Sequence, residues 1–143
     1  MMKRIKYVSR FAKPLTSSDI EALTVQSAEK NKALDITGVL MTSGGMFFQI
    51  IEGPSDNVDQ LYEEIVKDDR HQDVLALNID PDVSTRLFPD WSMKQVDLDV
   101  SSSIRAEPLK AILEAVIRQR EILESISNAL ERGIWNELTK AGL

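Results

Sequence analysis

The chain has 143 residues, no cysteine, one histidine and an apolar share of 43 %, which indicates an ordinary globular protein of single-domain size. Its 17 Lys and Arg against 23 Asp and Glu give a net charge of −6, and an acidic protein repels phosphate backbones. General nucleic-acid binding is therefore disfavoured. The lack of cysteine excludes disulfides, zinc–cysteine sites and thiol nucleophiles, and the single His71 disfavours a Ser-His-Asp triad or a metal site.

The sequence also lacks the usual signs of membrane insertion or export. No stretch approaches the roughly 18 consecutive apolar residues of a membrane span. The first residues, MMKRIKYVSRF, place charges before any apolar signal core. We therefore expect a soluble protein of the cytoplasm with no membrane partner.

The N-terminal residues predict a strand followed by a helix. Ile5–Ser9 alternates with period two, so Ile5, Tyr7 and Ser9 share one face of a strand. Ser18 with Glu21 three residues later has the capping-box spacing, which predicts that a helix begins there. Polar residues close this helix before the next apolar run.

A hairpin and a second helix follow. Ile36–Thr42 and Met46–Glu52 are β-rich runs, and the Ser43-Gly44-Gly45 segment between them is typical of a hairpin turn because glycine accepts positive φ. Ser55 is placed to cap the second helix, whose apolar residues recur at spacings of three and four. This helix is expected to end within Asp68–Arg70.

Two further strands are predicted at Val74–Ile79 and Ser92–Leu98, and Pro81, Pro89 and Asp90 mark the connection between them. The order of elements is therefore βαββαββ. This order predicts an α+β fold of the ferredoxin-like kind, with a five-stranded mixed sheet and two helices on one face. In such a sheet the first and third strands are central neighbours.

The C-terminal part predicts a long helix from Pro108 to Arg132, with Gly133 as its stop. About 25 residues at 1.5 Å each would span about 37 Å. We expect its apolar face to cover the free face of the sheet and to contribute to a homodimer. The expected division is a sheet-and-helix domain over residues 1–98 and a helical extension over 99–143. The apolar face consists of Leu109, Ile112, Leu113, Val116, Ile117, Ile122, Leu123, Ile126 and Leu130.

One polar residue interrupts the apolar pattern of the third strand. Gln49 shares a strand face with Phe47 and Ile51, and burying an amide costs about 1–3 kcal/mol unless its hydrogen bonds are satisfied. Because the first and third strands are neighbours, the Tyr7 hydroxyl is a candidate partner. Two interpretations remain open: a hydrogen bond that only fixes the sheet, and a polar group used in binding.

Other polar and aromatic residues have two interpretations each. Asn31, at the close of the first helix, either caps backbone carbonyls or bonds the edge of a heterocycle. In Asp68–His71 the Arg and His suit a phosphate, whereas the neighbouring carboxylates equally favour surface ion pairs. Trp91 and Met93 are two residues apart at the start of the last predicted strand, so they are expected to face the same way, as core or against an aromatic ring.

Six short motifs follow one another between about Lys3 and Val96. They are Tyr7-x-Ser9, Asn31, Ile36-Thr37-Gly38, Phe48-Gln49-x-x-Glu52-Gly53, Asp69-Arg70-His71 and Trp91-Ser92-Met93. Each alone is unspecific, but their combination resembles the BLUF family of blue-light sensors using flavin. The fold of that family agrees with the predicted βαββαββ order.

The resemblance implies a flavin between the two helices, flanked by Leu23 and Ile65. It implies that Asn31 bonds the polar edge of the ring and that Gln49 links the ring to the Tyr7 hydroxyl. The cofactor implied is FAD, with FMN as the alternative because Glu64 stands where some members carry a basic residue. The other implied cofactor-binding residues are Ser9, Asp68, Arg70, His71, Met93 and Trp91, with Lys30 standing where other members have an amide or histidine.

The resemblance also implies a mechanism. In this family light makes the flavin a strong oxidant, so Tyr7 is expected to give up an electron and, through Gln49, a proton in a reversible cycle. The Gln49 amide is left rearranged, and the absorption band shifts to the red. Tyr7 and Gln49 are thus the expected photochemical pair, and Trp91 and Met93 are expected to sense the change.

The expected function is a blue-light photoreceptor that is no enzyme by itself, because a chain ending at Leu143 has no room for a cyclase or phosphodiesterase. Its output goes through an unidentified partner protein or the dimer. Similarity to the sensor end of BLUF-linked nucleotide cyclases keeps a place in such a system open. The alternative from another class is a flavin-free ferredoxin-like interaction domain. An RNA-recognition module is disfavoured because adjacent Phe47 and Phe48 face opposite ways.

Overall fold

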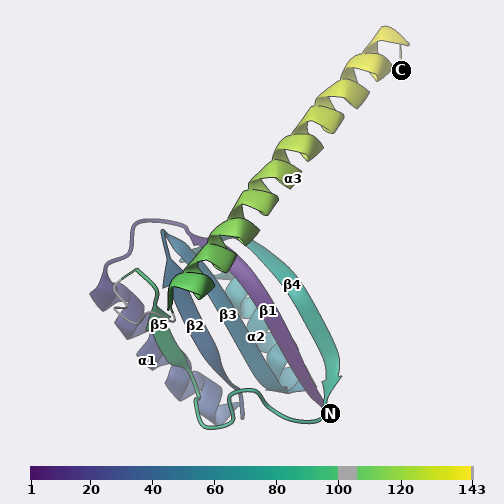
Figure 1. Cartoon of the computed structure of the whole chain (residues 1–143). Coiled ribbons are helices and arrows are strands. Elements are labelled where there is room, and N and C mark those ends of the chain that lie inside the picture. The colour runs from purple at the N-terminus through teal and green to yellow at the C-terminus, as the bar shows by residue number, and fades with distance from the viewer. Residues whose placement is uncertain (100–105, 143) are drawn as a thin grey trace. The chain divides into compact units, whose positions relative to one another are not determined.

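A computed structural model of the chain describes residues 1–99 and 106–142. The chain divides into two units, Met1–Ser102 and Ser103–Leu143. The described elements follow the predicted order βαββαββ and end with a long helix (Figure 1). They are β1 (Met2–Phe11), α1 (Ser17–Ala33), β2 (Thr37–Ser43), β3 (Met46–Pro54), α2 (Ser55–Lys67), β4 (His71–Val83), β5 (Lys94–Asp97) and α3 (Ala106–Lys140).

The five strands form one mixed sheet in the order β4-β1-β3-β2-β5. All neighbouring strands are antiparallel except β2 and β5, which are parallel. Figure 1 shows α1 and α2 together behind the sheet. The ferredoxin-like prediction is confirmed, and so is the expectation that the first and third strands are central neighbours, with Tyr7 opposite Gln49.

The apolar core of the first unit lies between the sheet and these two helices. Residues with alternate spacing on the central strands supply one side of it, and the inward faces of α1 and α2 supply the other. Two polar groups, the Tyr7 hydroxyl and the Gln49 amide, lie within this layer. The buried residues of the core are Ile5, Tyr7, Leu23, Ile36, Leu40, Phe47, Ile51, Val58, Leu61 and Met93.

Glycine is required at two places in the hairpin that carries Gln49. Gly44 and Gly45 form the turn with φ values of 55° and 78°, which side chains disfavour. On the strand before the turn, a Cβ at Gly38 would lie 1.9 Å from the Ile50 carbonyl oxygen. The predicted hairpin is confirmed, and the close approach at Gly38 lets β2 pack tightly against β3.

The predicted cap of the first helix is wrong by two residues. Thr16 is the N-cap: its side chain accepts from the Asp19 backbone N–H, and the Asp19 carboxylate accepts from the Thr16 N–H. Thr16 with Asp19 has the same spacing as Ser18 with Glu21, so the pattern alone did not distinguish the two pairs. The second helix also begins differently, because Ser55 is already helical and its hydroxyl donates to the Met1 carbonyl instead of capping.

The last two strands differ in length from their predictions. β4 is longer and includes Pro81, which an edge strand tolerates because one side of its backbone needs no partner. β5 is shorter, so Trp91 and Met93 both precede it. The expectation that these two side chains face the same way is wrong: Met93 is 8 % exposed and Trp91 is 43 % exposed.

The C-terminal helix α3 has 35 residues, which corresponds to a length of about 52 Å. It continues through Gly133, so the predicted stop is wrong; one glycine costs a helix only about 1 kcal/mol. The helix ends before Gly142, whose φ is 75°. The side chains of Leu109 and Leu113, predicted on its apolar face, lie outside the described residues. None of the described helices combines the length and apolar character needed to cross a membrane.

Candidate functional site

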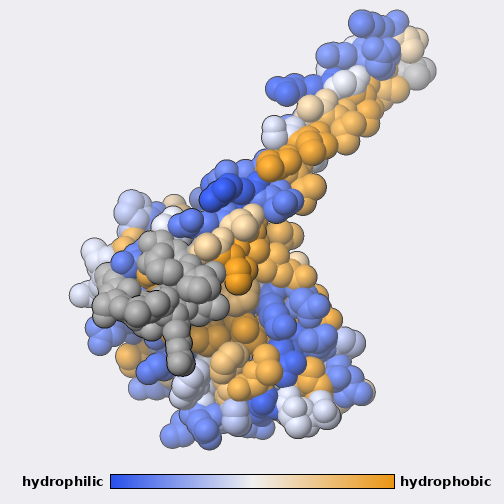
Figure 2. All heavy atoms as spheres, viewed as in Figure 1, coloured by the Kyte–Doolittle hydropathy of each residue, from blue (hydrophilic) through white to orange (hydrophobic). Residues whose placement is uncertain are grey.

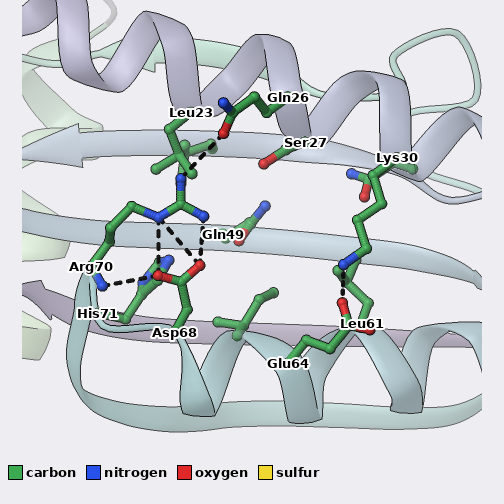
Figure 3. A pocket seen from close by; sticks show the side chains of 13 residues that line it. Leu23, Gln26, Ser27, Lys30, Gln49, Leu61, Glu64, Asp68, Arg70 and His71 are labelled. Atoms are coloured by element: carbon green, nitrogen blue, oxygen red, sulfur yellow. Dashed lines mark hydrogen bonds and ion pairs between the residues drawn. The ribbon is translucent and has the colours of Figure 1, made fainter.

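A cavity of about 180 Å³ lies between α1 and α2, over the middle of the sheet (Figure 3). This is many times the space that one water molecule needs, so the cavity is not a packing defect. Its walls combine apolar and polar side chains. The lining residues are Leu23, Gln26, Ser27, Lys30, Asn31, Leu40, Gln49, Leu61, Glu64, Ile65, Asp68, Arg70 and His71.

Gln49 lies on the sheet wall of the cavity and is bonded to Tyr7, as the strand order predicts. The Tyr7 hydroxyl donates to Gln49 Oε1, and Gln49 Nε2 donates to Met93 Sδ at 3.4 Å. A thioether sulfur is a weak acceptor, so an oxygen or nitrogen acceptor on a ligand would replace it favourably. The Gln49 oxygen is therefore engaged by Tyr7, whereas its Nε2 can donate to a ligand atom in place of the Met93 sulfur.

The Tyr7 side chain is completely buried. Burial raises the pKa of its phenol well above the ordinary value, and the charges of Tyr62 and Asp68 raise the pKa further. At neutral pH Tyr7 is therefore protonated and acts as the donor to Gln49. With its pKa raised, the Tyr7 phenol would not lose its proton to a carboxylate or an imidazole of ordinary pKa.

Asn31 contributes a buried amide from the last turn of α1. Its Nδ2 donates to the Ser92 carbonyl at 2.9 Å, so the side chain does not cap the helix that carries it. Its Oδ1 is buried and has no hydrogen-bond partner among the described residues. A buried acceptor without a donor costs about 1–3 kcal/mol. Because Asn31 lines the cavity, an N–H group on a ligand would satisfy this oxygen.

Arg70 lies at one end of the cavity and is held mainly by a carboxylate. Its Nη2 lies 2.5 Å from Asp68 Oδ2, and its Nη1 reaches Gln26 Oε1 on α1 at 3.4 Å. Hydrogen bonding to Arg70 lowers the pKa of Asp68 to about 2. The ion pair that the sequence offered as one interpretation of Asp68–His71 is therefore present, and it compensates the charge of Arg70.

His71 is bonded to the first strand. Its Nδ1 lies 2.7 Å from the Ser9 hydroxyl, and its ring packs on Phe47 with centroids 4.6 Å apart. Burial lowers the pKa of His71 to about 4, so the imidazole is neutral at neutral pH. In this state His71 offers hydrogen bonds but no positive charge to a phosphate.

The structure brings most of the predicted site residues together. Tyr7, Ser9 and Met93 lie behind the lining residues and bond to Gln49 or His71. Trp91 does not line the cavity: it stacks on Phe88, with ring centroids 5.7 Å apart. The predicted residues that line the cavity are Leu23, Asn31, Gln49, Ile65, Asp68, Arg70 and His71.

Sequence reasoning missed the lining residues Gln26 and Ser27 and the contact between Lys30 and Glu64, each of which it had named only as a departure from the family pattern. Gln26 and Ser27 follow Leu23 at helical spacings of three and four, and polar residues on an inward helix face are the signal that would have found them. Lys30 of α1 forms an ion pair with Glu64 of α2 across the cavity (Figure 3). The hydrogen bond from Lys30 lowers the pKa of Glu64.

Comparisons with known proteins identify the family to which the chain is similar. A family model described as "BLUF: Sensors of blue-light using FAD" matches residues 2–94. The photoactivated adenylate cyclase subunit beta of Euglena longa is 29 % identical over 122 residues, which cover 85 % of this chain but 14 % of that protein. The chain thus spans a small part of that curated relative.

Solved structures are similar as well. The structure of a bacterial light-regulated adenylyl cyclase has a TM-score of 0.82 and 38 % identity, over 87 % of this chain and 36 % of that chain. The dark-state structure of BlrB, described as a BLUF protein, has a TM-score of 0.64 and 38 % identity, over 68 % of this chain and 74 % of that chain.

Proposed function

Because this chain belongs to the BLUF family and is a blue-light sensor that binds flavin, we propose that the cavity between α1 and α2 is its flavin site. The observation that carries the proposal is the buried Asn31 Oδ1, which lines the cavity and has no donor among the described residues. A flavin ring has an N–H group on its polar edge that would supply this donor.

The other lining residues fit the same group. Leu23 of α1 and Ile65 of α2 line the cavity from its two sides and offer apolar contact to the faces of a flat ring. Gln49 Nε2 offers a donor to the acceptor atoms of the ring, in place of the weak Met93 sulfur. Asn31, Leu23, Ile65 and Gln49 would therefore hold the ring from four directions.

We propose Tyr7 and Gln49 as the photochemical pair. A bound flavin supplies a strong oxidant when it absorbs blue light. Loss of an electron makes the Tyr7 phenol strongly acidic, and Gln49 Oε1, which already accepts its hydrogen bond, is the group that takes the proton. The Gln49 amide then rotates or tautomerises, which changes the donors it presents to the cavity and to Met93. When the electron and proton return to Tyr7, the Gln49 amide is left rearranged, and it recovers its dark hydrogen bonds later, in darkness.

Of the two flavin nucleotides we propose FAD. The family model names FAD in its description. A second cavity adjoins the first and shares Leu23, Gln26 and Arg70 with it. It also contains Lys13 together with Asp19, so Lys13 lies where the phosphates of a longer flavin nucleotide would extend. FMN would occupy less of this space, and extraction of the bound flavin followed by chromatography distinguishes the two.

We propose that the chain has no enzymatic activity of its own and signals through α3, to a second copy or to a separate partner protein. Apolar side chains recur every three to four residues along the C-terminal half of α3, and Figure 2 shows them as an orange stripe on this helix. Covering the free sheet face and pairing with another copy are both compatible with such a stripe. The stripe consists of Leu123, Ile126, Leu130, Ile134 and Leu138.

The oligomer proposal is tested by measuring the mass in solution, in darkness and under blue light, for the whole chain and for a variant that ends after Ser103. A dimer that becomes monomeric on truncation supports it, and a monomeric whole chain contradicts it.

A second candidate is a sensor part in a light-regulated nucleotide cyclase system. It is favoured by the match to a bacterial cyclase over 87 % of the chain. The expected cytoplasmic location stays a prediction.

The deciding experiment for the flavin site is an absorption spectrum of the purified protein before and after blue light. We expect a flavin band that shifts to the red and relaxes in darkness. An Asn31→Ala variant is expected to bind flavin more weakly by a factor of about 5 to 150, because about 1–3 kcal/mol of hydrogen bonding is lost. Unchanged affinity in this variant would contradict the site.

A further inference from the structure

We propose that Lys30 and Glu64 are positioning residues: their ion pair, the Lys30–Glu64 bridge, ties α1 to α2 across the cavity and sets how long a flavin stays bound. The inference goes beyond the proposed function, although it rests on flavin binding between the two helices. Neither residue needs to contact the flavin for the bridge to act.

The location of the bridge is the first argument. Lys30 Nζ is paired with Glu64 Oε2, and both side chains line the cavity (Figure 3). The two side chains are 51 % and 41 % exposed, so the pair lies at the mouth of the cavity and not in its floor. A ligand that leaves between the helices passes this pair.

The second argument is the packing of the helices. α1 packs chiefly on β2 and β5, whereas α2 packs on β1, β3 and β4. The two helices therefore rest on different parts of the sheet. They are joined by the hydrogen bond from Asn57 Nδ2 of α2 to the Leu34 carbonyl at the end of α1, at 2.9 Å, and by side chains that reach across the cavity. Figure 3 shows the bridge crossing from one helix to the other.

The third argument is the identity of the neighbours. Lys30 directly precedes Asn31, whose buried Oδ1 has no partner among the described residues, and Glu64 directly precedes Ile65. Both neighbours line the cavity and are proposed flavin contacts. Holding Lys30 and Glu64 together therefore fixes the separation of two residues that would touch the ring from opposite sides.

At the opposite end of the cavity, α1 is linked to the segment that follows α2 in a different way. There Arg70 reaches Gln26 of α1 with a single hydrogen bond of 3.4 Å, while its main partner is Asp68 next to it in sequence. Among the described lining residues, the direct ion pair between the two helices is thus Lys30 with Glu64. An exposed pair of this kind opens readily, which suits a mouth that must admit a ligand.

A different role for Lys30 makes different predictions. If Lys30 bound a flavin phosphate directly, Glu64→Lys would add a second cation and slow the release of FMN, and riboflavin, which has no phosphate, would respond to neither substitution. If the pair acts as a bridge, either charge reversal places like charges across the mouth. Both single variants then release FMN and riboflavin faster, and exchanging the two charges restores the attraction.

The experiment compares Lys30→Glu, Glu64→Lys and the double variant in the whole chain, each loaded with FMN or with riboflavin. Flavin release after dilution is followed by the rise of flavin fluorescence, at low and at high salt. The matched controls are Lys32→Glu and Glu63→Lys, exposed charge reversals on the same two helices that do not line the cavity.

We expect each single variant to release either flavin about 3 to 10 times faster at low salt, since exposed pairs are weak, and the double variant to differ from the unsubstituted protein by less than about twofold. Salt is expected to speed release from the unsubstituted protein and to slow it in the single variants, because screening weakens attraction and repulsion alike.

Three results would overturn the bridge. The single variants would release flavin at the rate of the controls, or the double variant would be as fast as the singles, or Glu64→Lys would slow the release of FMN alone. Failure of the flavin site itself looks different: the unsubstituted protein would then hold neither FMN nor riboflavin. Circular dichroism of each variant verifies that the fold is intact.

Discussion

The Tyr7 hydroxyl donates a hydrogen bond to Gln49 Oε1 within the apolar core, between two residues that are directly opposite each other on β1 and β3. This bond fixes which end of the Gln49 amide faces Met93, because the oxygen is already engaged. The Tyr7–Gln49 pair thus determines that the amide nitrogen of Gln49, and not its oxygen, is the group available to the cavity.

Tyr7→Phe removes the hydroxyl and keeps the ring. We expect a folded, yellow protein whose flavin band does not shift to the red under blue light, because the electron and proton donor is gone. Absorption spectra in darkness and after illumination measure this. Tyr62→Phe, which removes a hydroxyl from a tyrosine beside Tyr7, is the control and is expected to keep the shift.

Gln49→Leu removes the amide that takes the proton and rearranges. We expect flavin to bind and the red shift to be absent, although Tyr7 is present. Leucine suits its apolar neighbours Phe47 and Ile51, but the buried Tyr7 hydroxyl loses its acceptor, so the free energy of unfolding is expected to fall by about 1–3 kcal/mol. Gln72→Leu, at an exposed position of β4, is the control. A normal red shift in Gln49→Leu would contradict the proposed mechanism.

His71 predicts a pH dependence of stability. Its pKa in the folded protein is about 4, below the ordinary value of 6.5, so the unfolded chain binds the proton more readily between these pH values. The stabilisation is therefore complete above about pH 6.5 and is lost as the pH falls toward 4. Between pH 7 and pH 5 the free energy of unfolding is expected to fall by about 2 kcal/mol.

Urea unfolding of the flavin-saturated protein at both pH values measures this change. His71→Gln keeps a hydrogen-bonding side chain and removes the titration, so its stability is expected to change little over the same range. Equal pH dependence in the two proteins would show that His71 is not the group responsible.

Glu52 predicts a large loss of stability. This carboxylate is fully buried; its Oε2 accepts from Arg4 Nε at 2.9 Å and from the Leu87 N–H, and its Oε1 accepts from the Phe88 N–H at 2.7 Å. Glu52→Ala would leave these donors without their acceptor and is expected to cost about 3–5 kcal/mol. The urea midpoint measures the effect, with Glu63→Ala on the exposed side of α2 as control. A loss below about 1 kcal/mol would contradict this assignment.

The sheet and the Tyr7–Gln49 pair could be predicted from the sequence because they depend on short-range pattern and strand order. Alternation places Gln49 on the face of Phe47 and Ile51, and the βαββαββ order then places β1 beside β3. The resemblance added the ligand, since an amide in a core indicates only that some partner exists.

The Lys30–Glu64 bridge and the position of Trp91 could not be predicted in this way. The two bridge residues are 34 positions apart, and their meeting depends on how α1 and α2 lie on the sheet. Trp91 lies outside because β5 begins three residues later, and strand ends are set by pairing with β2, not by local composition. Contacts that depend on the orientation of whole elements leave little trace in one sequence.

The shortness of β5 has a consequence for how the fold responds to the cavity. β5 has four residues, lies at the edge of the sheet, and begins directly after Met93, the residue that contacts Gln49. An edge strand with so few ladder bonds is the element whose amide hydrogens exchange with solvent soonest. It is therefore the part of the sheet that can shift at small cost while β1 and β3 keep their register, and the rigid centre can hold the flavin while the edge moves.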